Sequence, residues 1–157
     1  RIYLLNYYLE QFRTTVYRQT MFAEFEKITH EKVENKEPLT ADEFTAIYYD
    51  LNKKYYGKSA IVDNQIGLEW ARIPHFYSNF YVYKYATGFS AASALSQQIL
   101  NEGQSAVDRY LEFLKSGGSE YPLTQLKNAG VDMEKKEAVD KALEVFSSLV
   151  EKLEKEY

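Results

Sequence analysis

The residues of this chain best suited to chemistry are a histidine and the closely spaced tyrosines that follow it. After His75 come Tyr77, Tyr81, Tyr83 and Tyr85. Tyr77, Tyr81 and Tyr85 are spaced four apart, so they would share one face of a helix, while Tyr83 would point elsewhere. An imidazole and phenols held over a dry cleft can donate hydrogen bonds to a tetrahedral oxyanion. Such an aromatic stripe is also typical of a core or an interface, so the cluster alone names no reaction.

A second candidate is the sequence HEKVE at residues 30–34, which is similar to a zinc-binding helix motif. His30 and Glu34 stand at positions i and i+4, which share a helical face. The second histidine of an HExxH motif is missing, and the chain has only two histidines, so the ligand set is incomplete. We therefore expect a solvated helix end here and no metal ligand in this chain.

Composition excludes several other classes of site. The 157 residues include no cysteine, which removes thiol nucleophiles and cysteine zinc sites. No nucleophile elbow or glycine-rich phosphate loop is present, and Gly117-Gly118 is interpreted as a turn. A formal charge of −4, from 19 Lys and Arg against 23 Asp and Glu, argues against nucleic acid and membrane surfaces as partners. Because no long apolar run or signal-type segment is present, we expect a cytoplasmic protein.

The N-terminal third of the chain predicts two helices. Apolar residues recur every three or four positions over residues 2–33, which indicates one long amphipathic helix. This helix starts without a capping residue, from which we infer that Arg1 is a cut end. Pro38 should end the helix, because proline disfavours the helical conformation in the residue before it. A capping box that starts at Thr40 predicts the second helix, over about residues 41–56.

The rest of the chain also carries helical signals. We expect a partly packed loop over residues 57–67, then a short helix over residues 69–73 that Pro74 ends. Gly103 and Gly130 suit the C-terminal ends of helices. The further predicted helices cover residues 78–101, 106–115, 122–129 and 137–155. No segment alternates with a period of two, so the predicted fold class is all-α, with the whole chain as one helical domain or fragment.

Several stretches of the chain resemble one known family. They are similar to the C-terminal part of enzymes of the oligoendopeptidase F type, in the M3 family of zinc metallopeptidases. The resemblance covers essentially the whole chain, and it implies the multi-helix C-terminal portion of a zincin fold of the neurolysin and thimet type. The stretches are RTTVYRQTMFAEFE (13–26), LEWARIPHFY (68–77), YVYKYATGFS (81–90), LKSGGS (114–119) and AGVDM (129–133).

The resemblance implies that the parent protein is a zinc metalloendopeptidase that cuts short peptides. In this family the two histidines of an HExxH helix and a later glutamate hold one zinc ion. None of these ligands is present here. The resemblance thus implies that these residues precede Arg1 in the same protein. The missing N-terminal part would then be the principal partner of this chain, which alone would bind no zinc and be inactive.

Candidate site residues follow from the resemblance position by position. His75 matches a histidine, and Tyr81 and Tyr85 match tyrosines, that hydrogen-bond the scissile carbonyl and stabilise the oxyanion. One position where several relatives carry a further tyrosine is a glycine here. The second tyrosine donor can therefore also be Tyr77 or Tyr83, and we assign both of these to substrate binding.

Two other interpretations remain open. The chain could be a non-catalytic helical binding module that uses its tyrosine-rich face for a partner. Exposed apolar surface could also join two copies into a homodimer.

Overall fold

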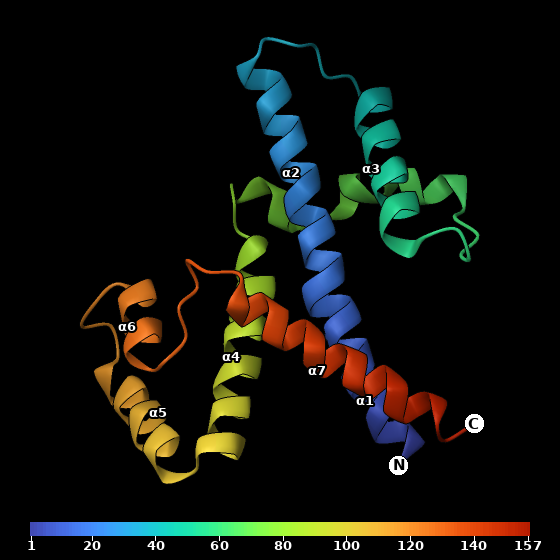
Figure 1. Cartoon of the computed structure of the whole chain (residues 1–157). Helices are drawn as coiled ribbons and strands as arrows, with labels where there is room; N and C mark the ends of the chain where they lie inside the picture. Colours follow the sequence, from blue (N-terminus) through green and yellow to red (C-terminus); the bar gives the residue numbers. More distant parts are fainter. The chain divides into compact units, whose positions relative to one another are not determined.

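The computed structural model describes residues 1–157 and contains helices but no strand (Figure 1). The predicted all-α fold class is confirmed. None of the helices combines the length and the apolar character that crossing a bilayer requires. The elements in chain order are α1 (Ile2–Phe12), a π-helical segment η1 (Arg13–Tyr17), α2 (Arg18–Glu34), α3 (Ala41–Tyr56), the 3₁₀ segments η2 (Asn64–Arg72) and η3 (Pro74–Tyr77), α4 (Tyr83–Glu102), α5 (Gln104–Ser116), α6 (Pro122–Asn128) and α7 (Glu137–Glu154).

Local sequence signals account for the ends of several helices. α2 ends shortly before Pro38, as predicted. At the start of α3 the Thr40 hydroxyl accepts a hydrogen bond from the Glu43 N–H at 3.3 Å, and the Thr40 N–H donates to the Glu43 carboxylate at 2.8 Å. This reciprocal pair confirms the capping box. Gly103 and Gly130, which follow α4 and α6, have φ values of 68° and 97°, the left-handed region that glycine enters without strain.

The helix predicted over residues 78–101 begins later than expected. α4 starts at Tyr83, the sixth residue of the predicted range, and residues 78–82 form a turn. Phe80 has a φ of 55°, which no residue of a right-handed helix adopts. The Phe80 N–H donates to the Glu26 carboxylate at 2.6 Å instead of to a helical carbonyl. The helical periodicity of this stretch is therefore overridden by a hydrogen bond to a distant residue.

The short helix predicted over residues 69–73 is longer than expected and tighter than an α-helix. It is the 3₁₀ segment η2, which begins inside the predicted loop. The Asp63 side chain caps it by accepting the Gln65 N–H at 2.8 Å. A side-chain acceptor at this position satisfies an amide that has no partner within the helix.

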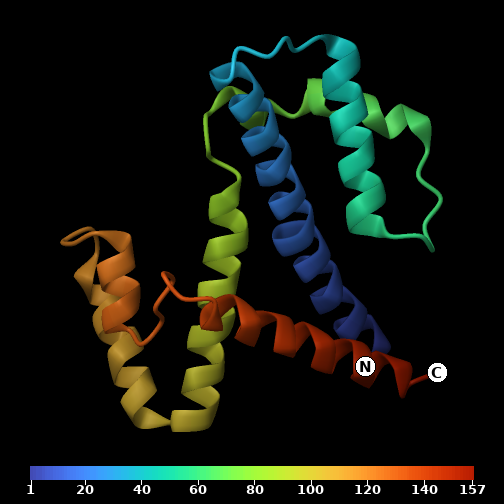
Figure 2. The same cartoon turned by 45° about the horizontal axis from the view of Figure 1, so that its top comes forward.

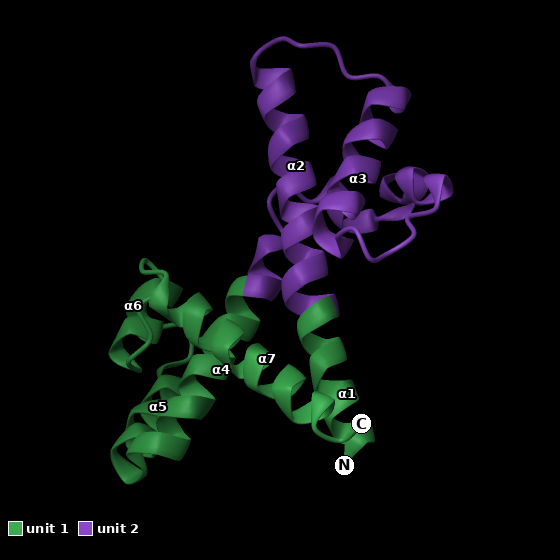
Figure 3. Ribbon diagram, turned by 45° about the vertical axis from the view of Figure 1, so that its right-hand side comes forward, with its two compact units in different colours: residues 1–13, 87–157 green, residues 14–86 purple.

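The chain divides into two compact units (Figure 3). Unit 1 comprises Arg1–Arg13 and Thr87–Tyr157, and unit 2 comprises Thr14–Ala86. Each unit has a hydrophobic core of its own.

In unit 1, α1 packs against α7. The fully buried ring of Phe12 lies 4.8 Å from that of Phe89 and 5.5 Å from that of Phe146, measured between centroids. α5 and α6 lie next to each other (Figure 2). The hydrophobic core of this unit is built largely from small side chains, which allow close approach of their backbones. Its buried residues are Ala91, Ala94, Leu95, Ala129, Val131 and Ala138.

Unit 2 has an aromatic core formed by α2, α3 and the segments that follow α3. The Phe25 ring meets the fully buried Tyr48 ring edge-on at 5.3 Å and lies 5.1 Å from the Phe76 ring. Such aromatic pairs add to the stabilisation that burial provides. The buried residues of this core are Met21, Phe22, Phe25, Tyr48, Leu51, Ile73 and Val82.

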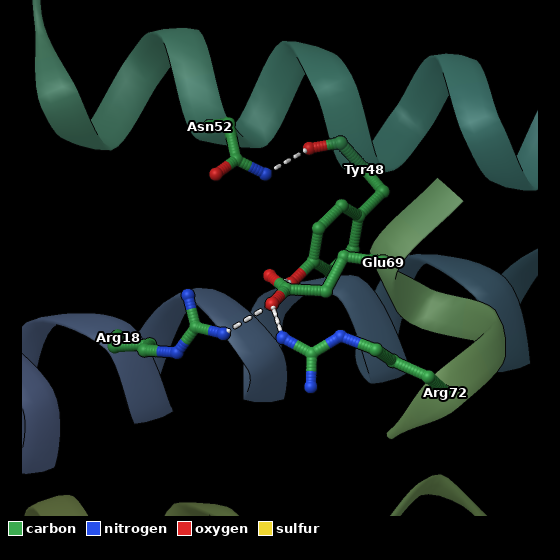
Figure 4. A network of polar contacts seen from close by, with 5 residues as sticks. All are labelled: Arg18, Tyr48, Asn52, Glu69 and Arg72. Atoms are coloured by element: carbon green, nitrogen blue, oxygen red, sulfur yellow. Dashed lines mark hydrogen bonds and ion pairs between the residues drawn. The ribbon is translucent and has the colours of Figure 1, made fainter. Parts of the chain in front are cut away.

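A buried carboxylate joins three elements of unit 2 (Figure 4). Glu69 of η2 is only 8% exposed. One of its oxygens accepts a hydrogen bond from Arg18 of α2 at 2.7 Å and another from Arg72. The other oxygen accepts one from the Tyr48 hydroxyl of α3 at 2.7 Å. Because two cations and a hydroxyl satisfy the carboxylate, its burial is compensated, and η2 is fixed against both long helices.

The same carboxylate makes the stability of unit 2 depend on pH. Burial would raise the pKa of Glu69, but hydrogen bonds from Arg18 and Tyr48 outweigh it, and the pKa lies below its ordinary value. A carboxyl group whose pKa falls on folding stabilises the fold fully above its unfolded-state pKa. That contribution is lost as the pH falls through the folded-state pKa.

We therefore expect Glu69→Gln to lower the free energy of unfolding at neutral pH by about 3 kcal/mol, because the largely buried Arg18 guanidinium loses its counter-charge. We also expect the wild-type chain to lose more stability than Glu69→Gln between about pH 6 and about pH 3. Urea denaturation followed by the fluorescence of Trp70, the single tryptophan, measures both quantities.

Glu31→Gln is the matched control, because Glu31 is exposed on α2 and pairs only with the exposed Lys27, at 3.6 Å. Its stability should stay within about 0.5 kcal/mol of wild type. Equal pH dependence in the wild-type chain and Glu69→Gln would contradict the role given to Glu69.

Candidate active site

Three of the predicted site residues come together in unit 2. The ring centroids of His75 and Tyr81 lie 5.8 Å apart with nearly parallel planes, and Tyr85 meets His75 and Tyr81 edge-on at 5.9 Å and 5.6 Å. The Tyr85 hydroxyl lies 3.3 Å from His75 Nε2, within hydrogen-bonding distance. We call these three residues the His75 cluster. It gathers one imidazole and two phenols, all of which can donate hydrogen bonds.

The other two predicted residues are placed differently. Tyr77 ends η3 and is 86% exposed, and Tyr83 begins α4 and is 49% exposed. Tyr77 and Tyr81 both precede α4, so the expectation that Tyr77, Tyr81 and Tyr85 share one helical face is wrong. Tyr81 meets Tyr85 because a turn, and not a helix, directs it there.

The segment that carries His75 is anchored by apolar side chains. Ile73, directly before η3, is buried, and so is Val82, directly before α4. Between them the Phe76 ring packs 5.6 Å from the ring of Phe22 on α2. Pro74 occupies the first position of η3, where its missing N–H costs nothing. The backbone is thus held on both sides of His75, while the His75 side chain stays half-buried.

Tyr81 is the most accessible member of the cluster. It is 40% exposed, and the Lys84 ammonium lies 5.1 Å from the centroid of its ring. The neighbouring Tyr81 hydroxyl, and to a smaller extent burial, raises the pKa of Tyr85. Tyr85 therefore remains protonated near neutral pH, the form in which a phenol donates a hydrogen bond.

A pocket of about 360 Å³ adjoins the anchored segment. Its wall is mainly apolar and includes the aromatic residues Phe25, Phe44, Trp70, Phe76 and Tyr77. The Phe44 and Trp70 rings stack at 4.9 Å. A largely apolar hollow of this size is typical of a site that accepts a side chain.

The second sequence candidate, at residues 30–34, lies in the last turns of α2. The His30 ring contacts the Phe80 ring at 4.7 Å and is half-buried, whereas Glu31 and Glu34 are exposed. No group of three or more His, Asp or Glu side chains converges anywhere in the chain. The residues of this chain therefore do not fit a zinc ion by themselves.

Two buried glutamates of unit 2 were missed by reasoning from the sequence. Glu26 is 5% exposed and Glu69 is 8% exposed, and each accepts hydrogen bonds from residues far away in the chain. The signal for Glu26 is its position, since it lies four residues after Phe22 on the buried face of α2. An acidic residue at such a position needs donors from another element.

Comparison with known proteins places the chain in a family. The sequence profile of peptidase family M3 matches residues 1–145. This chain belongs to peptidase family M3. The resemblance noted from the sequence is thereby confirmed.

Relatives with high sequence identity have names that describe oligopeptidases. The chain is 58% identical over 154 residues to oligopeptidase PepF of Bacillus subtilis (strain 168), covering 98% of the chain and 23% of that protein. It is 46% identical over 155 residues to an oligoendopeptidase F homolog of Lactococcus lactis subsp. lactis (strain IL1403), covering 99% of the chain and 26% of that protein. The chain thus spans about a quarter of the length of these relatives.

A solved structure supports the fold. The chain superimposes on the crystal structure of oligoendopeptidase-F from Enterococcus faecium with a TM-score of 0.96 and 48% sequence identity. The match covers 99% of this chain and 30% of that one. The helical arrangement described here is therefore that of a segment of an M3 peptidase.

The contact between Tyr81 and Tyr85 gives a test of the cluster in this chain. Tyr81→Phe removes the hydroxyl that raises the pKa of Tyr85, so Tyr85 should titrate at a lower pH in the variant. The titration can be followed by NMR of ¹³C-labelled tyrosine, with the Tyr85 signal assigned from Tyr85→Phe. Tyr77→Phe, which removes an exposed hydroxyl outside the cluster, should leave the Tyr85 titration unchanged. An unchanged Tyr85 titration in Tyr81→Phe would mean that the two phenols do not interact.

Proposed function

We propose that this chain is the C-terminal part of a larger zinc-dependent oligoendopeptidase that hydrolyses short peptides. Membership of peptidase family M3 and the names of the relatives support a peptidase. The observation that carries the proposal is the His75 cluster, because it gathers three hydrogen-bond donors on an anchored segment. In this proposal the parent protein works in the cytoplasm, and its partners are short peptides, not nucleic acids or membranes.

The metal would be held outside this chain. We propose that its ligands, the two histidines of an HExxH helix and a later glutamate, lie in a part of the protein that precedes residue 1. When bound, the zinc ion would polarise the scissile carbonyl and activate water. The His75 cluster would donate hydrogen bonds to the oxygen of the same carbonyl group.

The proposed work of the His75 cluster is electrostatic. During peptide hydrolysis the carbonyl oxygen gains negative charge, and donors already aimed at that position lower the barrier because they need no reorganisation. His75 and Tyr81 are the proposed donors. Tyr85 contacts both and would orient the imidazole through its contact with Nε2. The 3.3 Å separation is long for a hydrogen bond, but such contacts often tighten only in the complex with substrate.

The surroundings of the cluster would form part of the peptide channel. The aromatic pocket beside η3 is proposed to accept an apolar side chain of the peptide, with Tyr77 at its margin. Tyr83 is proposed to contact the peptide backbone. Burial of one apolar side chain in such a pocket contributes about 1.5 to 3 kcal/mol to binding.

α1 has an exposed apolar face, which suits contact with a large partner. Tyr3, Leu4 and Tyr7 are 77%, 68% and 57% exposed. Exposed apolar residues grouped in this way are typical of an interface. Because the chain spans about a quarter of its relatives, we propose that the remaining part of the same protein covers this face, in place of a second copy of the chain.

A complementation experiment tests the proposed function. The isolated chain should not cleave peptides, whereas mixing it with the separately produced preceding part of the protein should restore cleavage that a zinc chelator abolishes. The measurement is hydrolysis of a fluorogenic short peptide. A non-catalytic binding module predicts no cleavage in the mixture, and that result, with both parts folded, would contradict the proposal.

Within the complete peptidase, His75→Ala should lower kcat by about 10²- to 10³-fold, the usual cost of losing one oxyanion donor. Zinc content should stay unchanged, because His75 is not a proposed ligand. Steady-state kinetics and metal analysis measure the two quantities. Tyr121→Phe, which alters an 84% exposed tyrosine in unit 1, is the control and should keep the wild-type kcat. Wild-type kcat/KM in His75→Ala would refute the assignment.

A further inference from the structure

The turn that directs Tyr81 has an unfavourable backbone conformation. Residues 78–81 close a turn in which the Tyr81 N–H donates to the Ser78 carbonyl at 3.2 Å. Phe80 is the third residue of this turn, and its φ is 55°. Positive φ at that position is usual for glycine or asparagine. For a bulky residue it costs about 1 to 3 kcal/mol and persists only when the surroundings enforce it.

A buried carboxylate enforces this conformation. The Phe80 N–H donates to Glu26 Oε1 at 2.6 Å, across 54 residues of sequence. Glu26 is 5% exposed, and the hydrogen-bond partner of its carboxylate is this backbone amide, not a cationic side chain. A charged acceptor makes this hydrogen bond stronger than one between neutral groups. Burial of a carboxylate without a counter-charge is costly, and here it fixes one amide of the turn.

Packing also holds the residues on both sides of Tyr81. The Phe80 ring lies 4.7 Å from the His30 ring, one helical turn beyond Glu26 on α2. Val82, two residues after Phe80, is fully buried. Tyr81 stands between these two anchors, so the direction of its side chain follows from the backbone that Glu26 holds.

We propose that Glu26 is a positioning residue: its carboxylate holds the Phe80 amide and thereby directs the Tyr81 side chain toward His75 and Tyr85. This role rests on the proposed function, in which Tyr81 donates to the oxyanion. Glu26 itself does not touch the reacting atoms. It acts through the turn.

A double-mutant cycle in the complete peptidase tests this role. Glu26→Ala should lower kcat by about 10- to 100-fold, because misplacing a donor by about 1 Å has effects of that size, while KM changes less. In a Tyr81→Phe background the same substitution should have little further effect on kcat, because the group that it positions is already gone. The measurements are kcat and KM with one short peptide, together with the melting temperature of each variant.

Two further variants separate positioning from folding. Glu26→Gln keeps an acceptor oxygen for the Phe80 N–H, so it should lose less kcat than Glu26→Ala. Phe80→Gly should recover part of the kcat lost in Glu26→Ala, because glycine adopts positive φ at little cost. Should Glu26→Ala fail to fold, Glu26→Gln replaces it in the cycle with Tyr81→Phe.

Glu24→Ala is the matched control, since Glu24 lies on the same helix but accepts hydrogen bonds from Lys54 and from the Tyr55 hydroxyl. Any effect of Glu24→Ala on kcat should be the same with and without the Tyr81 hydroxyl. Equal effects of Glu26→Ala in the wild-type and Tyr81→Phe backgrounds would overturn the positioning role alone. A wild-type kcat in Tyr81→Phe would refute the role of Tyr81 itself, and with it the role of Glu26.

Discussion

The interaction on which unit 2 depends is the burial of the Glu69 carboxylate among Arg18, Tyr48 and Arg72 (Figure 4). A carboxylate in a protein interior is costly unless donors replace the water it has lost. Here the donors come from α2, from α3 and from η2 itself. The requirement to satisfy one buried charge thus fixes a short 3₁₀ segment against two long helices.

The fixed position of η2 determines where the next residues can go. η2 leads directly through Ile73 into η3, so a backbone held at Glu69 delivers His75 to a defined place. Ile73 and Val82 are both buried in the same aromatic core. The stretch between them contains no α-helix, although it lies in an otherwise helical unit. Side chains with chemical roles are often carried by such irregular segments, because a rigid scaffold can aim them without sharing their geometry.

Two buried acids serve this segment in different ways. Glu69 is balanced by two guanidinium groups, so its charge is largely neutralised within the structure. Glu26 is matched by a backbone amide, so its carboxylate fixes the position of the main chain instead of joining side chains. Neither acid belongs to a cluster that could bind a metal ion. Their shared contribution to an M3 peptidase is to hold the segment that carries His75, within a chain that spans about a quarter of its relatives.

The sequence by itself determined the helical class, the ends of several helices and the candidate residues of the site. The capping box at Thr40, the stop before Pro38 and the glycine after α4 act within one helical turn, so residue spacing reveals them. Tertiary structure decided where α4 begins and which tyrosines meet His75. Those outcomes depend on hydrogen bonds between residues 21, 51 and 54 positions apart, made by Glu69 and Glu26. Helical periodicity at residues 78–82 was outweighed because a buried carboxylate must find a donor, and the Phe80 amide was the one that the folded chain brought within reach.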